Sequence, residues 1–268
     1  MSKIADQAYL RDKQYRSAAN LNDRIQLHVR FSTNRYGWMP WVFDQLALPA
    51  DARVLELGCG PGRLWSENLA RIPAGWQITL TDFSPGMLDE ARRNLAQSER
   101  PFAFEVVDAQ AIPFEDAGFD GVIANHMLYH VPDRPGALAE IRRVLRPGGR
   151  LYATTVGASH LRELFELAVR FDPALVAWGG PSTDSFRLEN GAAQIAAWFE
   201  HVELRRYDDG LVVTEAEPLV AFIMSMNASK HVAEQERAEL LRQVEQIIRA
   251  DGSIRIAKDS GMFLAVAP

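Results

Sequence analysis

The chain has 268 residues, of which 47% are hydrophobic and 24% charged, as expected for a globular protein. Its net charge is −6 at pH 7 and no run of lysine and arginine exceeds a pair, which disfavours a nucleic-acid partner because phosphate neutralisation needs a basic face. A single cysteine excludes an intrachain disulfide, and the polar N-terminus and lack of a long apolar run predict a cytoplasmic protein with no membrane partner.

The N-terminal part is expected to be helical and rich in aromatic side chains. Residues 2–30 mix apolar and polar side chains in a pattern that predicts one or two amphipathic helices, broken near Asn20 to Asn22. Residues 31–43 then hold a dense aromatic cluster, which can seat a helix on the core. A second interpretation places Tyr36 and Trp38 in the wall of a ligand site, since aromatic faces attract cationic groups.

Residues 53–69, RVLELGCGPGRLWSENL, predict a buried strand, a glycine turn and a helix. The glycines permit a sharp turn and a close approach of a ligand to the backbone. A dinucleotide-binding turn has the spacing Gly-x-Gly-x-x-Gly, whereas this turn has Gly58-x-Gly60-x-Gly62. Glu56 also places a carboxylate just before the turn, which suits a cationic ligand better than a phosphate.

The second strand candidate spans residues 76–80 and leads to Asp82. An open α/β fold places the carboxylate that binds ribose hydroxyls at about this position. Ser84 and Pro85 then predict a helix start, and an apolar stripe that includes Met87 predicts that the helix packs on the sheet.

Two more strand candidates, residues 102–108 and 119–125, end at Asp108 and Asn125. A helix over 134–145 and a fifth strand ending near Thr155 follow. Alternating strands and helices predict a mostly parallel sheet with helices on both faces and a ligand crevice at the carboxyl ends of the strands.

Beyond Val156 the pattern predicts helices over 160–171 and 188–199, a strand over 201–208, and helix throughout 215–251. The last segment has two short apolar strands around Asp259-Ser260-Gly261, which predict a terminal hairpin whose second strand is antiparallel in the sheet. Trp178, in the glycine-rich stretch between the first two helices, is a candidate acceptor contact.

These motifs resemble those of the class I S-adenosylmethionine-dependent methyltransferases of small-molecule type. The resemblance runs from Val54 to Thr155 and rests on the acidic strand end before the glycine turn, Asp108-Ala109 followed by Ile112-Pro113-Phe114, and Arg146-Pro147-Gly148-Gly149 before the fifth strand. It implies an α/β fold: a Rossmann-like, doubly wound, seven-stranded, mostly parallel sheet with helices on both faces, N-terminal helices and a helical cap.

The implied cofactor is S-adenosyl-L-methionine, whose ammonium and sulfonium suit Glu56, and whose adenine is contacted in the family by the Asp-Ala pair at 108 and 109. Asp82 is assigned to the ribose, Phe83 and Met87 to its flanks, and Asn125 to the methionine moiety. The expected cofactor contacts are Glu56, Gly58, Cys59, Gly60, Asp82, Phe83, Met87, Asp108, Ala109, Gln110 and Asn125. Arg30, Arg35 and Arg63 are candidates for the cofactor carboxylate.

His126 and His130 are the candidates for a general base, with Tyr129 orienting either ring, because histidine titrates near neutrality. If residues 126–130 form a helical turn, the two rings share a face. Asp133 could complete a metal site with them, but the resemblance argues against a metal and Asp133 suits a helix start. The backbone of Cys59, rather than its sulfur, is expected to meet the cofactor.

The predicted function is methyl transfer to an O or N nucleophile of a small, partly apolar molecule, in specialised metabolism, by a monomer or homodimer. The alternatives are a nucleic-acid methyltransferase, a non-catalytic cofactor-binding module, and an enzyme that uses the cofactor for another reaction such as cyclisation. The expected organisation is an N-terminal covering segment (1–50), a cofactor-binding core (51–156) and a remainder (157–268) that completes the sheet and carries cap insertions at 159–187 and 214–251.

Overall fold

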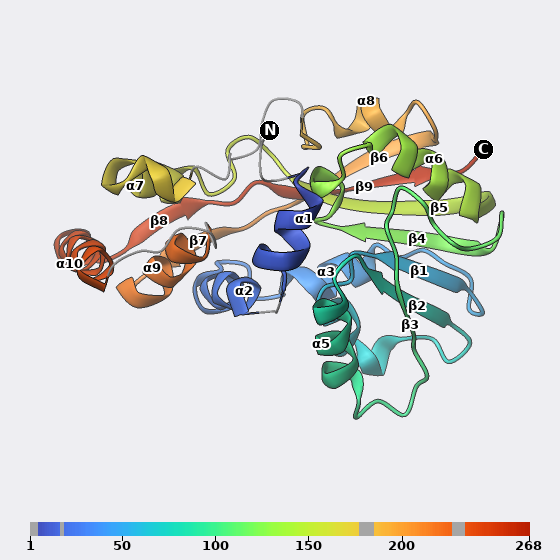
Figure 1. Ribbon diagram of the computed structural model, residues 1–268, viewed down its shortest axis with the longest axis horizontal. Helices are drawn as coiled ribbons and strands as arrows, with labels where there is room; N and C mark the ends of the chain where they lie inside the picture. Colours follow the sequence, from blue (N-terminus) through green and yellow to red (C-terminus); the bar gives the residue numbers. More distant parts are fainter. Residues whose placement is uncertain (1–4, 17–18, 177–184, 227–233) are drawn as a thin grey trace.

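The computed structural model describes residues 5–16, 19–176, 185–226 and 234–268, and its centre is a seven-stranded sheet in the order β3-β2-β1-β4-β5-β9-β6 (Figure 1). All neighbouring strands are parallel except β9, which is antiparallel to both β5 and β6. This arrangement confirms the predicted fold class. The strands are β1 Arg53–Leu57, β2 Gln77–Asp82, β3 Ala103–Val106, β4 Phe119–Asn125, β5 Leu145–Val156, β6 Glu200–Tyr207 and β9 Ser260–Val266.

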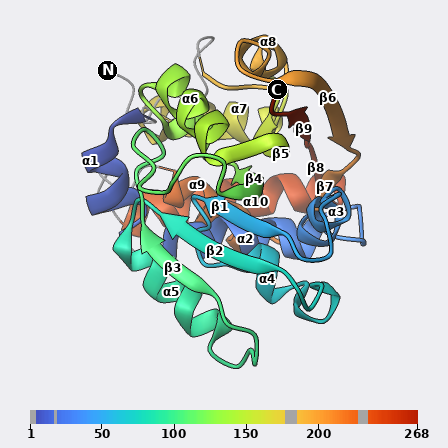
Figure 2. The same cartoon turned by 90° about the vertical axis from the view of Figure 1, so that its right-hand side faces the viewer.

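Helices cover both faces of this sheet, as Figure 2 shows. One face packs on α6 (Arg134–Val144) and α8 (Gly191–Ile195), and the other on α3 (Trp38–Asp44), α4 (Arg63–Ser66) and α5 (Pro85–Leu95). Central strands that are covered on both sides require continuous apolar runs. The runs around Val54 and Val122 meet that requirement, since both side chains are fully buried.

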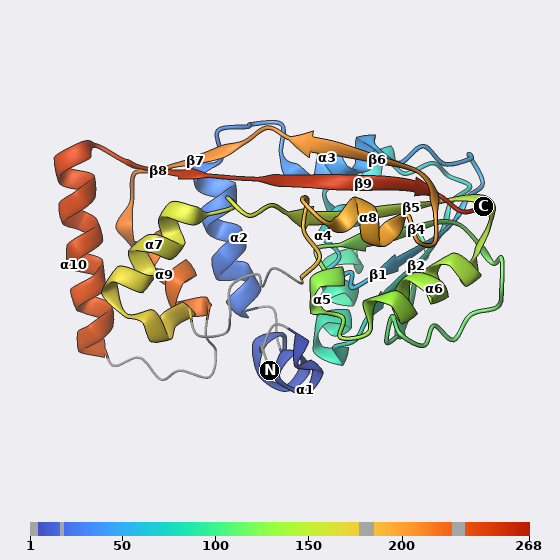
Figure 3. The ribbon, with the colours of Figure 1, turned by 90° about the horizontal axis from the view of Figure 1, so that it is seen from above.

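A second hydrophobic core lies beyond the carboxyl ends of the parallel strands. It is built on a two-stranded antiparallel sheet, β7 (Gly210–Val213) with β8 (Ile254–Ala257). Four helices pack around it: α2 Ala19–Phe31, α7 Arg162–Phe171, α9 Ala216–Ser225 and α10 Glu234–Asp251. We call this part the cap. The N-terminal segment, residues 5–16, contains a short helical stretch at residues 7–14 and lies between the cap and the core (Figures 1 and 3).

The predicted terminal hairpin is wrong. β8 does not fold back on β9; β8 pairs with β7 in the cap while β9 pairs with β5 and β6 in the main sheet. Figure 3 shows β7 and β8 continuing the line of β6 and β9 as one long ribbon. The ribbon is interrupted where Asp209 forms a buried ion pair with Lys258. The apolar pattern gives strand positions but not partners, because pairing depends on contacts far apart in sequence.

Other predicted elements differ in extent. The helix expected over 188–199 is limited to α8, because the side chain of Asn190 accepts a hydrogen bond from the backbone N–H of Arg187 at 2.9 Å and holds a turn there. The break expected near Asn20 to Asn22 is also wrong, since α2 runs through these positions. The helix expected throughout 215–251 is divided into α9 and α10, and residues 227–233 lie outside the described part.

Candidate active site

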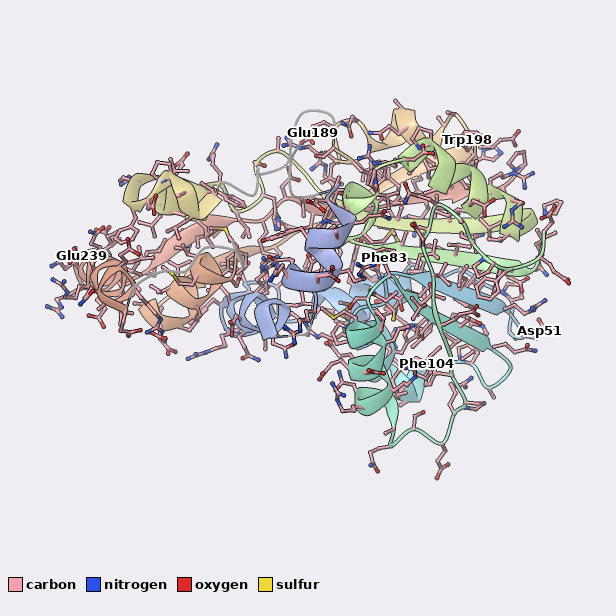
Figure 4. The ribbon with its side chains drawn as sticks, in the orientation of Figure 1. Asp51, Phe83, Phe104, Glu189, Trp198 and Glu239 are labelled. Atoms are coloured by element: carbon pink, nitrogen blue, oxygen red, sulfur yellow. The ribbon has the colours of Figure 1, made fainter. Side chains whose placement is uncertain are left out.

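A cavity of about 840 Å³ lies between the core and the cap, at the carboxyl ends of β1, β2 and β4. Strand ends from one side and cap helices from the other contribute to its wall, so residues distant in sequence face one space. Ten of the eleven expected cofactor contacts line it: Glu56, Gly58, Cys59, Gly60, Asp82, Phe83, Met87, Asp108, Ala109 and Asn125. Figure 4 labels Phe83, which lies beside the N-terminal segment.

The glycine turn after β1 has a backbone that side chains would not tolerate. Gly58, Gly60 and Gly62 have φ values of +66°, +53° and +74°, in the region that favours glycine. A Cβ added at Gly58 would lie 2.8 Å from Cβ of Met127. The sequence at these positions therefore fixes the shape of the turn and leaves its backbone open to the cavity.

Asp82 holds this turn in place from the neighbouring strand. Its Oδ2 accepts the backbone N–H of Gly60 at 2.9 Å and its Oδ1 accepts that of Ser84 at 2.8 Å. Burial raises the pKa of Asp82 to about 6, although these two hydrogen bonds oppose the shift. Each oxygen keeps a lone pair that a ligand hydroxyl can use.

Glu56 is buried, with 2% of its surface exposed, and both of its oxygens are engaged. Trp65 Nε1 donates to Oε2 at 2.6 Å and Asn125 Nδ2 donates to Oε1 at 3.1 Å. Burial raises the pKa of Glu56 to about 7, with the two donors lowering it. The donors are neutral, so this carboxylate has no cationic partner among the described residues.

Asp108 is fixed by amide donors from two directions. Gln7, in the N-terminal segment, donates to Oδ2 at 2.9 Å, and the backbone N–H of Gln110 donates to Oδ1 at 3.0 Å. Burial would raise the pKa of Asp108, but these hydrogen bonds bring it below its ordinary value. Gln110 is the expected contact that does not line the cavity; its side chain braces Asp108 and accepts the backbone N–H of Asp133.

The N-terminal segment closes one side of the cavity through polar contacts. Tyr15 Oη lies 3.1 Å from Nε2 of His130, and Ser84 Oγ donates to the carbonyl oxygen of Tyr15 at 2.8 Å. Gly86 allows this approach, because a Cβ there would lie 2.3 Å from the carbonyl oxygen of Arg16. Both partners of Tyr15, His130 and Ser84, belong to the core, so the segment covers the strand ends.

The three expected catalytic side chains, His126, Tyr129 and His130, all line the cavity, but not on one helical face. His126 has a left-handed backbone (φ +49°), and only Leu128–His130 form a short 3₁₀ turn. Tyr129 lies between the histidines, with ring centroids 6.4 Å from His126 and 4.5 Å from His130. Burial, together with the charges of Lys258 and His130, lowers the pKa of His126 to about 4.

Of the three expected acceptor contacts, one lines the cavity, one does not, and one lies outside the described residues. Trp38 lines the cavity and packs on His126 with ring centroids 5.2 Å apart, and its indole N–H has no hydrogen-bond partner among the described residues. The expectation for Tyr36 is not met: its side chain is 54% exposed and its hydroxyl donates to Asp44. Tyr36 lies in the turn before α3 and does not line the cavity. Trp178 lies outside the described residues.

Two of the three arginine candidates for the cofactor carboxylate line the cavity. Arg30 does not line the cavity and instead pairs with Glu215 in the cap. Arg35 and Arg63 line the cavity, and Arg63 pairs with Glu67 one helical turn away. The thiol of Cys59 is buried, which raises its pKa, while its backbone N–H donates to the carbonyl oxygen of Thr81 at 2.8 Å. A thiolate role is therefore disfavoured, because only the deprotonated sulfur is nucleophilic.

Sequence reasoning missed the polar residues that the cap adds to the cavity: His28 from α2, His160 before α7, and Lys258 between β8 and β9. The rings of His28 and His160 stack with centroids 6.3 Å apart. Burial lowers the pKa of His28 to about 3 and that of His160 well below its usual value. No signal in the sequence links these positions, which are brought together only by the ribbon and α2.

Comparison with known proteins finds similarity to methyltransferases in sequence and in fold. A family model described as a methyltransferase domain matches residues 55–153. A ubiquinone biosynthesis O-methyltransferase of Xanthomonas oryzae pv. oryzae (strain PXO99A) is 33% identical over 160 residues, which are 59% of this chain and 65% of that relative. One of Xanthomonas campestris pv. campestris (strain B100) is 32% identical over 171 residues, which are 63% of this chain and 69% of that relative.

Among solved structures, the phosphoethanolamine N-methyltransferase 2 of Haemonchus contortus in complex with S-adenosyl-L-methionine has a TM-score of 0.61 and 18% identity. The match covers 99% of this chain and 60% of that one, and at this identity the likeness is one of fold. In the described part of this chain, no helix is long and apolar enough to cross a membrane.

Proposed function

Because this chain belongs to the class I S-adenosylmethionine-dependent methyltransferases, we propose that it methylates a hydroxyl oxygen of a small, partly apolar acceptor. The cofactor is S-adenosylmethionine, which supplies an activated methyl group. The protein's own task is to place the acceptor, exclude water and accept a proton.

The cavity's donor and acceptor groups fit this cofactor. The open backbone at Gly58 and Gly60 admits a ligand, and three carboxylates, Glu56, Asp82 and Asp108, lie at or near the carboxyl ends of β1, β2 and β3. A buried carboxylate held by neutral donors suits a cationic amino group, so we assign Glu56 to the methionine end. Asp82 then takes the ribose hydroxyls and Asp108 the adenine edge.

The observation that carries the acceptor class is the pairing of an aromatic ring with a neutral imidazole in the cavity wall. The rings of Trp38 and His126 pack there at an angle of 39°, and the burial that lowers the pKa of His126 keeps its ring uncharged at neutral pH. Flat rings favour an aromatic acceptor, and an uncharged imidazole accepts a hydrogen bond from a hydroxyl. The relatives' description as O-methyltransferases supports oxygen as the methylated atom.

We assign the proton-accepting role to His126. Its backbone N–H is anchored to Oγ1 of Thr154 at 3.0 Å, which holds the ring at the tip of β4. Tyr129 packs between His126 and His130 and limits the rotation of both rings. With the cofactor bound, the acceptor hydroxyl would give its proton to the imidazole and its electron pair to the new O–CH₃ bond, while the S–CH₃ bond breaks and its electron pair stays with the sulfur of S-adenosylhomocysteine.

The test is a methylation assay with S-adenosylmethionine and a panel of catechols, hydroxybenzoates and hydroxyquinones, set against matched amines and an RNA. We expect methyl ethers of hydroxylated aromatics, detected by mass spectrometry together with S-adenosylhomocysteine. The His126→Asn variant should lose at least ~10-fold in kcat. The matched control is His201→Asn, because His201 is exposed and has the same left-handed backbone (φ +50°).

Three outcomes would contradict the proposal. Methylation of amines alone would move the acceptor class to nitrogen, and methylation of RNA would restore the nucleic-acid alternative. Cofactor binding without any methylated product across the panel would favour a binding module or a different reaction.

A further inference from the structure

Lys258 is a buried cation that faces the cavity from the junction of the two sheets. Its side chain is 7% exposed, and it pairs with Asp209, whose side chain has no exposed surface. Burying an ion pair is costly, and apolar residues of similar size often stabilise a fold equally well. The pair therefore invites a functional explanation.

Asp209 is surrounded by donors besides the lysine. Ser32 Oγ donates to Oδ2, and the backbone N–H groups of Asn34 and Gly210 donate to Oδ1 at 2.9 and 2.8 Å. Although burial would raise the pKa of Asp209, these hydrogen bonds and Lys258 bring it below its ordinary value. The carboxylate's charge is thus shared among several donors, while the ammonium has no other hydrogen-bond acceptor among the described residues.

Two imidazoles border the same part of the cavity. The backbone N–H of Asp259 donates to Nδ1 of His160 at 3.2 Å, so this nitrogen is an acceptor and the proton of the neutral ring is on Nε2. His160 thus presents an N–H donor. His28 is tied to the ion pair through Ser32, whose backbone N–H donates to the carbonyl oxygen of His28 at 3.1 Å. The Nδ1 atom of His28 is shielded from solvent and has no hydrogen-bond partner among the described residues.

We propose that Lys258, His28 and His160 form the subsite that holds a second ionisable hydroxyl of the acceptor, a phenolic or enolic group beside the one that gives its proton to His126, as its oxyanion. This proposal rests on the proposed function. Lys258 provides the charge, the Nε2–H group of His160 provides a second donor, and the ring of His28, stacked on that of His160, forms the adjoining wall. A cation beside two uncharged imidazoles selects an acidic oxygen and rejects an amine, which would be protonated and repelled.

The aromatic ring of such an acceptor has matching apolar contacts. Phe222 packs edge-on against His28 with ring centroids 5.9 Å apart, and Phe165 and Leu161 of the cap also line the cavity. The cap thus places these apolar side chains beside the polar subsite, which suits a hydroxylated aromatic molecule.

The experiment uses 4-nitrocatechol, whose absorbance differs between the neutral and anionic forms, with the full-length protein saturated with S-adenosylhomocysteine. At a pH where the free compound is mostly neutral, we expect the bound compound to show the anion spectrum. The Lys258→Met variant should lose that spectrum and bind at least tenfold more weakly. Lys13→Met, at an exposed lysine of the N-terminal segment, is the matched control.

Because Lys258→Met leaves Asp209 buried without its partner, the double variant Lys258→Met with Asp209→Asn tests the same point in a neutral site. His160→Phe should weaken binding, because it removes the Nε2–H donor, and His160→Gln should restore part of it. No binding by the wild type, a neutral spectrum when bound, or an unchanged anion spectrum in the double variant would each overturn the proposal. Binding of S-adenosylhomocysteine is measured separately, and methylation is not required, so a failure of the proposed function is recognised independently.

Discussion

The backbone N–H of Gly60 donates a hydrogen bond to Oδ2 of Asp82 at 2.9 Å, so the carboxylate at the end of β2 holds the glycine turn that follows β1. One side chain thus shapes the neighbouring turn and faces the ligand. This dual role makes Asp82 the most informative position in the cofactor half of the cavity.

Replacing Asp82 with alanine should weaken binding of S-adenosylmethionine and S-adenosylhomocysteine by about 1 to 3 kcal/mol, because the ribose hydroxyls and the Gly60 N–H lose their acceptor. Isothermal calorimetry measures the change. Asp89→Ala, on the exposed face of α5, is the control. Unchanged affinity in a folded Asp82 variant would remove the ribose assignment.

Gly86→Ala should displace the N-terminal segment, since the added Cβ would lie 2.3 Å from the carbonyl oxygen of Arg16. We expect a folded protein whose segment is cleaved faster by protease and which releases S-adenosylhomocysteine faster. Gly210→Ala is the control, because its Cβ would lie 3.5 Å from the nearest atom. Equal proteolysis and release in the two variants would mean that the segment does not cover the site.

Glu56→Gln should stabilise the ligand-free protein at pH 8 but not at pH 5. Burial raises the pKa of Glu56 from 4.5 to about 7, so the folded state binds its proton more tightly and loses stability as pH rises from 4.5 through 7. The gain at pH 8 should be about 1 to 3 kcal/mol. Thermal unfolding at both pH values measures it, with Glu105→Gln on exposed β3 as control.

If this gain is equal at pH 5 and pH 8, the Glu56 side chain is not titrating as described. The same variant should bind the cofactor more weakly at pH 8, because glutamine cannot pair with an ammonium group.

The cavity imidazoles should remain uncharged at pH 5. The pKa values of His28 and His126 are lowered from 6.5 to about 3 and about 4, chiefly by burial. As pH falls below 6.5, the unfolded chain binds protons that the folded chain does not, so each ring decreases stability on acidification. Nitrogen-15 shifts of the rings, assigned with His28→Gln and His126→Asn, measure the charge. Imidazolium shifts at pH 5 would refute the buried environment of the rings.

The glycine turn and the carboxylates at strand ends could be predicted because their chemistry is local. A positive φ favours glycine at Gly58 and Gly60, and the crevice of such a fold lies at the carboxyl ends of the parallel strands. The strand-helix alternation further predicted the sheet and, through the resemblance, the cofactor. Gln110 was an expected cofactor contact, but it does not line the cavity, because its side chain turns back to Asp108.

The contribution of the cap to the cavity was decided by tertiary structure alone. Whether the last two strands form a hairpin or one ribbon depends on pairing with β7, which lies more than forty residues earlier, and an apolar pattern does not encode a partner. The pairing of β8 with β7 places Lys258 beside Asp209. Together with α2 and the start of α7, it also brings His28 and His160 to the same wall of the cavity. The sequence by itself therefore determined the turn and the carboxylates to which we assign the methyl donor, and the packing of the cap determined which of its polar groups face the proposed acceptor.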